Sequence, residues 1–238
     1  MSRPRAVDLN ADLGEGMPWD HELLALVTSA NVSCGAHAGD PAAIAATLAE
    51  AGRRGVVVGA HPSWPDRPGF GRVEREATAE EVERLVVGQV ADLRALAAAA
   101  GVAICYVKPH GALYNQAMRE DSGPIAAGLV AATRTLGLPF LGQPGTSIGR
   151  LVEDAGFPYV LEGFPDRAYR DDGRLVPRGE PGAMVEGVDA VVAQALRLVE
   201  RGVDSLCLHG DAAGSVERAV AIREALGRAG VAVRGFLA

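Results

Sequence analysis

The sequence of 238 residues has few cysteines, no long apolar run and no N-terminal signal pattern. The three cysteines are an odd number and do not make up a disulfide framework. No apolar stretch approaches the roughly 20 residues needed to cross a bilayer. Residues 1–5 (MSRPR) lead into VDLN after Ala6 rather than into an apolar signal core. We therefore predict a cytoplasmic protein.

Positive charge is scarce too. The formal net charge is −7 and the isoelectric point is near 5.3. Nucleic acids and anionic membranes require a basic face, so the composition argues against both partners and favours a small-molecule substrate.

Aromatic residues make up only 5% of the chain, whereas apolar residues make up 48%. The core must then be built mainly from Ala, Val and Leu on closely packed elements, which suits helices that cover parallel strands. The length suits one domain over residues 1–238.

A nucleotide motif is also absent. Neither Gly-x-x-x-x-Gly-Lys-Ser/Thr nor Gly-x-Gly-x-x-Gly follows a predicted strand. The segment Gly69-Phe70-Gly71-Arg72 has glycines that can cradle a phosphate, but loop glycines also simply turn the chain. Arg167 and Arg178 either bind a carboxylate or phosphate as planar forks or lie solvated in a loop.

What the sequence does contain is a regular alternation of short apolar runs and helical patterns. We predict strands near residues 6–12, 30–34, 55–60, 102–107, 139–142, 158–162 and 205–208, and an eighth within 231–236. Helices are predicted near residues 20–28, from 41 to 52 or 55, at 78–100, at 123–136, after 145, at 187–201 and before 231. Strands that are buried without polar alternation, each followed by a helix, predict a parallel sheet, either doubly wound or closed into a barrel.

Polar residues at the strand ends distinguish these two folds. Six different strands supply the set Asp12, His37, His61, Lys108, His110, Glu162, Asp166, His209 and Asp211. Barrels draw a site from the carboxyl ends of many strands, whereas a doubly wound sheet concentrates it at one switch point. We therefore predict a fold of the α/β class, an irregular (β/α) barrel with seven or eight parallel strands.

The only lysine, Lys108, stands at one of these strand ends, before Pro109, His110 and Gly111. Pro109 cannot continue the hydrogen bonds of a central strand, and Gly111 permits a sharp turn. Lys108 and His110, which can both transfer protons, are therefore held where the strand ends. We expect the Lys108 ammonium to meet a substrate oxygen or a phosphate. The alternative is a snorkelling lysine whose charged head reaches solvent.

Histidines are concentrated in the same places. Four of the five lie at strand exits, and only His21 falls at a helix start. This distribution favours a convergent active site over separate structural roles. Asp12, His61 and His110 are a potential set of ligands for a divalent metal, but no His-x-His or His-x-x-x-His pair accompanies them, so a metal stays an open alternative. Cys34, three residues before His37, is interpreted as a packing residue or as a nucleophile.

Five segments, in this order, resemble the LamB/YcsF family: 7–15 (VDLNADLGE), 30–40 (ANVSCGAHAGD), 59–63 with 68–72 (GAHPS, PGFGR), 107–115 (VKPHGALYN) and 209–211 (HGD). The similarity is collinear from about residue 6 to 236. One departure lies at Gly163 and Pro165, where the family usually has a larger residue and an alanine.

The resemblance implies a barrel akin to the glycoside hydrolase/deacetylase superfamily. It also implies ATP-dependent opening of the 5-oxoproline lactam to L-glutamate, with ATP as co-substrate and with 5-oxoprolinase subunits B and C as partners. Together with the strand-end positions, it leads us to assign catalytic roles to Asp12, His61, Lys108, His110, His209 and Asp211. Substrate binding is assigned to Asn10, Glu15, Asn31, His37, Asn115, Glu162, Asp166 and Arg167.

Two further hypotheses stay open from the sequence. A metal-dependent deacetylase would use Asp12 with two histidines, and a non-catalytic assembly subunit would use the polar cluster only for binding. For lactam hydrolysis, the amide oxygen must be stabilised or phosphorylated before water attacks. A histidine at 61, 110 or 209 would activate that water, with Asp12 or Asp211 orienting it.

Overall fold

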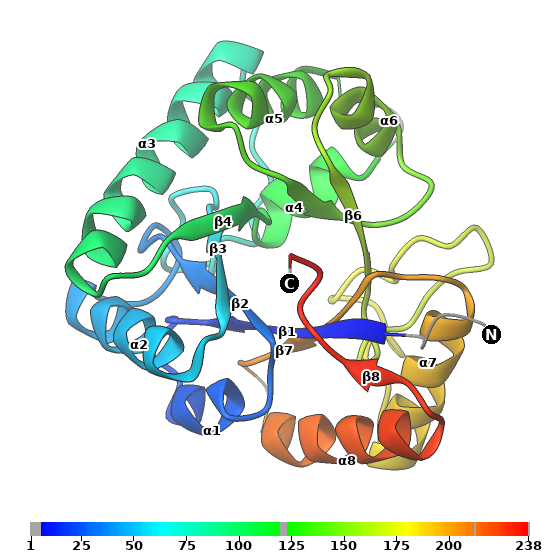
Figure 1. Ribbon diagram of the computed structural model, residues 1–238. Helices are drawn as coiled ribbons and strands as arrows, with labels where there is room; N and C mark the ends of the chain where they lie inside the picture. The colour runs from blue at the N-terminus through cyan, green and yellow to red at the C-terminus, as the bar shows by residue number, and fades with distance from the viewer. Residues whose placement is uncertain (1–5, 120–122, 212, 238) are drawn as a thin grey trace.

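The computed structural model describes residues 6–119, 123–211 and 213–237, in which seven parallel strands form a closed ring surrounded by helices (Figure 1). The first strand pairs with the second and the seventh and so closes the ring. An eighth strand pairs with Ala6 and Val7 at the start of the first strand and lies outside the ring. The strands are β1 (Ala6–Leu13), β2 (Ser29–Ser33), β3 (Val57–His61), β4 (Ile104–Val107), β5 (Phe140–Gly142), β6 (Tyr159–Gly163), β7 (Ser205–His209) and β8 (Ala232–Val233). The predicted irregular barrel is confirmed.

Helices follow the strands and cover the outside of the ring. They are α1 (Asp20–Leu24), α2 (Pro41–Arg54), α3 (Ala79–Ala99), α4 (Gly111–Ala117), α5 (Gly123–Leu136), α6 (Ser147–Asp154), α7 (Val188–Glu200) and α8 (Ser215–Arg228). The side chain of Asp40 caps the start of helix α2 by accepting from the backbone of Ala42 and Ala43, and Gly55, one of the two predicted ends, closes the helix with a φ of 68° that suits a glycine. Helix α4 was not predicted. Within the described residues, no helix has both the length and the apolar character that a bilayer crossing demands.

The inner face of β1 is polar, which differs from the prediction of strands without alternation. Leu9 and Ala11 are completely buried toward the helices, whereas Asp8, Asn10 and Asp12 alternate with them and are also buried. Their side chains form hydrogen bonds to residues of the neighbouring strands, such as Asn10 Nδ2 to Ser205 Oγ of β7 at 2.6 Å. Both faces of β1 are thus buried, one against apolar helices and one in a polar interior.

The amino-terminal end of the barrel is closed by aromatic packing. Tyr106 of β4 is fully buried, its hydroxyl donates to Asn31 Oδ1 at 2.7 Å, and its ring meets Phe236 edge-on with the centroids 5.1 Å apart. Figure 1 shows the segment after β8 crossing in front of the ring. A Cβ atom on Gly59 would lie 2.2 Å from the Tyr106 ring, so a glycine is required there.

One cluster of buried apolar side chains extends along the chain from Val7 to Val231. The ends of the predicted domain, residues 1–5 and 238, lie outside the described residues.

We predict that Gly59→Ala destabilises the protein by about 1–3 kcal/mol, because the fixed Tyr106 ring cannot move away from the added methyl group. The matched control is Gly88→Ala in the exposed part of α3, where no atom lies within 4 Å of the new Cβ. That change should stabilise the helix by about 0.5–1 kcal/mol. Urea denaturation measures both, and equal stability of the two variants would contradict the packing argument.

Candidate functional site

A pocket lies at the carboxyl ends of the strands and encloses about 430 Å³, including the part that is open to solvent. Five of the six residues predicted as catalytic line it: Asp12, His61, Lys108, His110 and His209. The sixth, Asp211, forms an ion pair with Arg72, which is itself a lining residue. The predicted convergence is therefore present in the fold.

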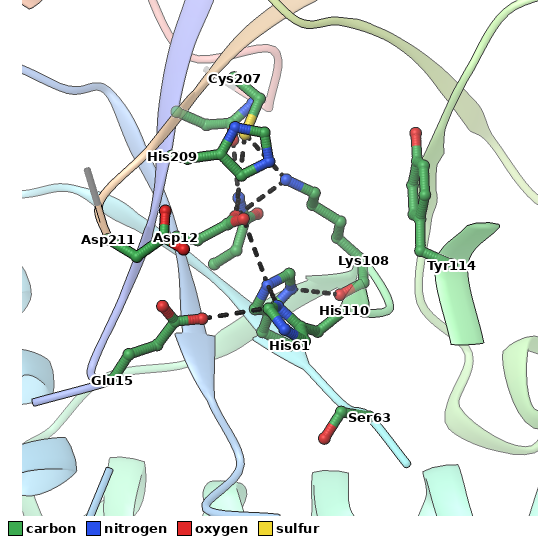
Figure 2. A network of polar contacts seen from close by, with 12 residues as sticks. Asp12, Glu15, His61, Ser63, Lys108, His110, Tyr114, Cys207, His209 and Asp211 are labelled. Atoms are coloured by element: carbon green, nitrogen blue, oxygen red, sulfur yellow. Dashed lines mark hydrogen bonds and ion pairs between the residues drawn. The ribbon is translucent and has the colours of Figure 1, made fainter. Parts of the chain in front are cut away.

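Lys108 lies at the centre of this group with only 2% of its surface exposed. Its ammonium is 2.8 Å from Asp12 Oδ1, 2.9 Å from Cys207 Sγ and 3.0 Å from Glu162 Oε1 (Figure 2). The snorkelling alternative is wrong. Two of the three ammonium hydrogens have acceptors in Asp12 and Cys207, and Glu162 lies at ion-pair distance, so a substrate oxygen would compete with the Glu162 carboxylate for Lys108.

The charges of this group support one another. Burial alone would raise the pKa of Asp12, but the neighbouring His61 ring and the Lys108 ammonium hold that pKa well below its usual value. Burial alone would lower the pKa of Lys108, but the carboxylate of Asp12, with Cys207 and Glu162, keeps it well above its usual value. Lys108 and Asp12 are therefore an ionised pair in the barrel interior.

His61 and His110 face each other in an arrangement that needs an additional positive charge. His61 Nδ1 lies 2.7 Å from the Lys108 carbonyl and His110 Nε2 lies 2.9 Å from the Phe70 carbonyl. A carbonyl only accepts, so each of these nitrogens carries a hydrogen. In neutral rings the other nitrogens, His61 Nε2 and His110 Nδ1, would then both be lone pairs, yet they lie 3.0 Å apart. An extra proton or a metal ion would satisfy both.

The surrounding donors fit a divalent cation. His61 Nε2 lies 3.4 Å from Asp12 Oδ2, and His110 Nδ1 lies 3.5 Å from Glu15 Oε1. Bonds of about 2.1 Å at tetrahedral or octahedral angles place neighbouring ligand atoms roughly 3.0–3.4 Å apart. Two imidazoles and a carboxylate are a common set for a transition metal, and Asp12, His61 and His110 have ligand atoms within 4.8 Å of one another.

Glu15 and His37 extend the group on the side of His110. The His37 and His110 rings stack at 3.8 Å, and His37 Nε2 lies 2.9 Å from Glu15 Oε1. Burial and the neighbouring His61 ring lower the pKa of His37 to about 3. Burial and the charges of Asp12 and Asp211 raise the pKa of Glu15 well above its usual value. Glu15 and His37 are thus a buried pair that holds the His110 ring in place.

Local backbone geometry positions the His110 ring. Phe70 has a φ of 55° and, in the described chain, is the one residue other than glycine with a positive φ. Its carbonyl accepts from His110 Nε2. Gly111, with a φ of 57°, begins α4, and a Cβ there would lie 2.4 Å from the Gly71 carbonyl oxygen. A strained loop and a glycine turn together fix His110.

His209 has a different environment from the other histidines of the pocket. Its Nδ1 lies 2.9 Å from Asp166 Oδ2, and its ring stacks on Phe164 with the centroids 5.6 Å apart. Burial alone would raise the pKa of Asp166, but the charge of His209 and hydrogen bonds from it lower that pKa. Since Nδ1 is held by the carboxylate, Nε2 is the nitrogen that remains for acid–base chemistry. The residue that orients this histidine is thus Asp166. Of the two carboxylates predicted to orient a histidine, Asp12 faces His61 at 3.4 Å and Asp211 pairs with Arg72.

The residues predicted to bind substrate fall into two groups. Asn115 and Arg167 line the pocket. The other six support the lining residues from behind: Asn10, Glu15, Asn31, His37, Glu162 and Asp166. Sequence reasoning assigned no role to Tyr114, Phe164 or Cys207, which contact Glu162, His209 and Lys108. For Cys207 a signal existed, because it lies two residues before His209 on the same face of β7.

The model of the LamB/YcsF family matches residues 7–238. A protein of Mycobacterium avium strain 104, named as the A subunit of 5-oxoprolinase, is 44% identical over 97% of this chain and 98% of that protein. The crystal structure of a lactam utilization protein from Thermus thermophilus is 40% identical, with a TM-score of 0.87, over 97% of this chain and all of that one. A family 4 carbohydrate esterase from Streptomyces lividans, in complex with acetate, shares the fold at 12% identity, with a TM-score of 0.52 and coverage of 96% and 91%.

We predict that Lys108→Met lowers the free energy of unfolding by roughly 3–5 kcal/mol, because Asp12 and Glu162 lose their shared counter-ion in a buried place. Adding Glu162→Gln to this variant should restore part of the loss. Arg228→Met, which removes an exposed ion pair with Glu224, serves as the control and should stay within about 0.5 kcal/mol. Urea denaturation measures all three, and a Lys108→Met loss no larger than that of the control would contradict the charge balance.

Proposed function

The chain belongs to the LamB/YcsF family, and from this premise we propose that it is the A subunit of a 5-oxoprolinase. It opens the 5-oxoproline lactam to L-glutamate, with ATP as co-substrate and together with subunits B and C. We place this activity in the cytoplasm and in a single barrel domain over residues 1–238. The lack of a phosphate-loop motif supports a role for the partner subunits in handling ATP.

The observation that carries this proposal is the pairing of two units in one pocket. The first is the Asp166–His209 pair, which presents a ring nitrogen for proton transfer. The second is the Lys108–Asp12 pair, which lines the same pocket beside His61 and His110. Lactam hydrolysis needs a base for water and an acid for the leaving nitrogen, as well as charge near the carbonyl.

His209 performs the proton transfers in this account. Its Nε2 takes a proton from the water that attacks the activated carbonyl carbon of the lactam. It then returns a proton to the lactam nitrogen as the C–N bond breaks. Asp166 keeps the Nδ1 hydrogen in place and stabilises the positive ring between these two steps. Lys108 keeps Asp12 ionised and fixed, rather than binding the lactam oxygen with a free hydrogen.

Asp12, His61 and His110 would hold a divalent metal, with Glu15 next to His110. Such an ion, when bound, would polarise a carbonyl or acidify a bound water. The same donor set favours a second candidate function, a metal-dependent deacetylase-like hydrolase. A third, a non-catalytic binding or assembly subunit, would leave the Asp166–His209 pair without a chemical role.

An assay of L-glutamate formed from 5-oxoproline and ATP tests the main proposal. The chain alone should be nearly inactive, and subunits B and C should restore turnover. In that complex His209→Ala should lower turnover by about 10²–10⁴-fold, because the proton-transfer group is lost. His21→Ala, at an exposed histidine, is the control and should leave turnover unchanged. The proposal fails if the complex forms no glutamate, or if both histidine variants keep wild-type turnover.

Metal analysis of the purified chain tests the ligand set. After incubation with Zn²⁺ or Mn²⁺ and desalting, the wild type should retain about one ion, since three neutral or anionic donors converge. His110→Ala should retain much less than His21→Ala. Equal retention by these two variants would show that the histidine pair needs a proton instead. Acetate release from an acetylated sugar, without ATP, would favour the deacetylase.

A further inference from the structure

Three arginines line the pocket, and their charges are compensated very differently. Arg72 forms an ion pair with Asp211 and lies over the Phe70 ring. Arg167 and Arg178 have no carboxylate partner within the described part of the chain. Arg167 donates to the Ala183 carbonyl at 3.3 Å and, through its terminal nitrogen, to the Val176 carbonyl at 2.6 Å.

Arg167 is buried, with 4% of its surface exposed, so its charge lies outside the screening of bulk water. Desolvation, followed by the charge of Arg178, lowers the pKa of Arg167 to about 10. The carboxylate of Asp166 offsets part of this effect, but it also holds His209 and forms no direct ion pair with Arg167 or Arg178. Burying one cation beside another without a direct counter-ion is costly. Neutral carbonyls satisfy the hydrogen bonds of Arg167 but not its charge. An anion in the pocket would balance both guanidinium groups.

Arg178 is half-buried and faces the same space. Its only hydrogen-bond contact in the described residues is a weak one, to the Met184 sulfur at 4.0 Å. A planar guanidinium that is not tied to a carboxylate can bind two oxygens of an incoming group at once. The backbone at Arg167 is held in place, because Gln194 donates to the carbonyls of Phe164, Pro165 and Arg167.

The opposite side of the pocket has a cation that is already paired. Lys108 lies there between the carboxylates of Asp12 and Glu162. Because Arg167 and Arg178 contact only carbonyls and a sulfur among the described residues, an anionic group would be attracted to these arginines. A small substrate with one anionic end and one neutral end would therefore enter in one orientation.

We propose that Arg167 and Arg178 form an oxyanion clamp that recognises the anionic end of the substrate and directs its neutral, reacting end toward Asp12 and His209. The inference rests on the proposed function for the identity of that substrate. The oxyanion is either the carboxylate of the lactam acid or a phosphoryl group on the activated lactam. Because both can present two anionic oxygens to a guanidinium, the chemistry is shared and the experiment separates the sources.

Calorimetric titration of the full chain with 5-oxoproline, 2-pyrrolidinone and inorganic phosphate tests the clamp. 2-Pyrrolidinone is the same ring without the carboxylate. Arg178→Gln should weaken 5-oxoproline binding by about 10–100-fold and leave 2-pyrrolidinone binding unchanged. Arg84→Gln, at an exposed arginine of α3, is the matched control and should change neither. Arg178 is the variant of choice because Arg167 also holds its loop.

Each outcome of this titration either supports or overturns the proposed clamp. If Arg178→Gln weakens phosphate binding but not 5-oxoproline binding, the clamp takes a phosphoryl group. If 5-oxoproline does not bind but phosphate binds through Arg178, the clamp stands and the proposed substrate fails. If 5-oxoproline binds equally to wild type and Arg178→Gln, and phosphate binding is also unchanged, the clamp is overturned while the proposed function stands. Failure of every anion to bind also overturns it.

Discussion

The buried ammonium of Lys108 is the interaction on which the site depends. It joins Asp12 of β1, Glu162 of β6 and Cys207 of β7, three strands that lie around the same barrel interior. Two carboxylates could not be ionised in that place without a cation between them. The same ammonium keeps Asp12 negative, and Asp12 in turn faces His61. The side chains that balance the charge of the barrel interior therefore also set the electrostatics of the pocket.

The polar interior of the barrel explains why so many site residues are unexposed. Asn31 donates to Asn10 Oδ1 and to Asp12 Oδ1, and thereby fixes the Asp12 carboxylate within the barrel interior. Asp166 and Glu15 do the same for His209 and His110 from the side. The lining residues reach the pocket only at the carboxyl ends of the strands. Such support reduces the reorganisation that a reaction in this pocket would require.

Much of this could be predicted from the sequence, because βα alternation and polar strand ends are local signals. Asp12, His61, Lys108 and His209 were located by their position after apolar runs, and their convergence follows from parallel strands alone. The partners were harder to assign. That Asp166 and not Asp211 orients His209 depends on how the loop after β6 folds back, and no local pattern encodes that. The tautomers of His61 and His110 depend on carbonyls from distant loops.

A crystal structure of the chain with 5-oxoproline tests the central claim most directly. The account predicts the lactam ring in the pocket, with its carbonyl between the Lys108–Asp12 pair and His209 Nε2, and with its carboxylate toward Arg178. A lactam bound elsewhere on the barrel, or bound in this pocket with its carbonyl more than about 5 Å from His209 Nε2, beyond the reach of one bridging water, would contradict it.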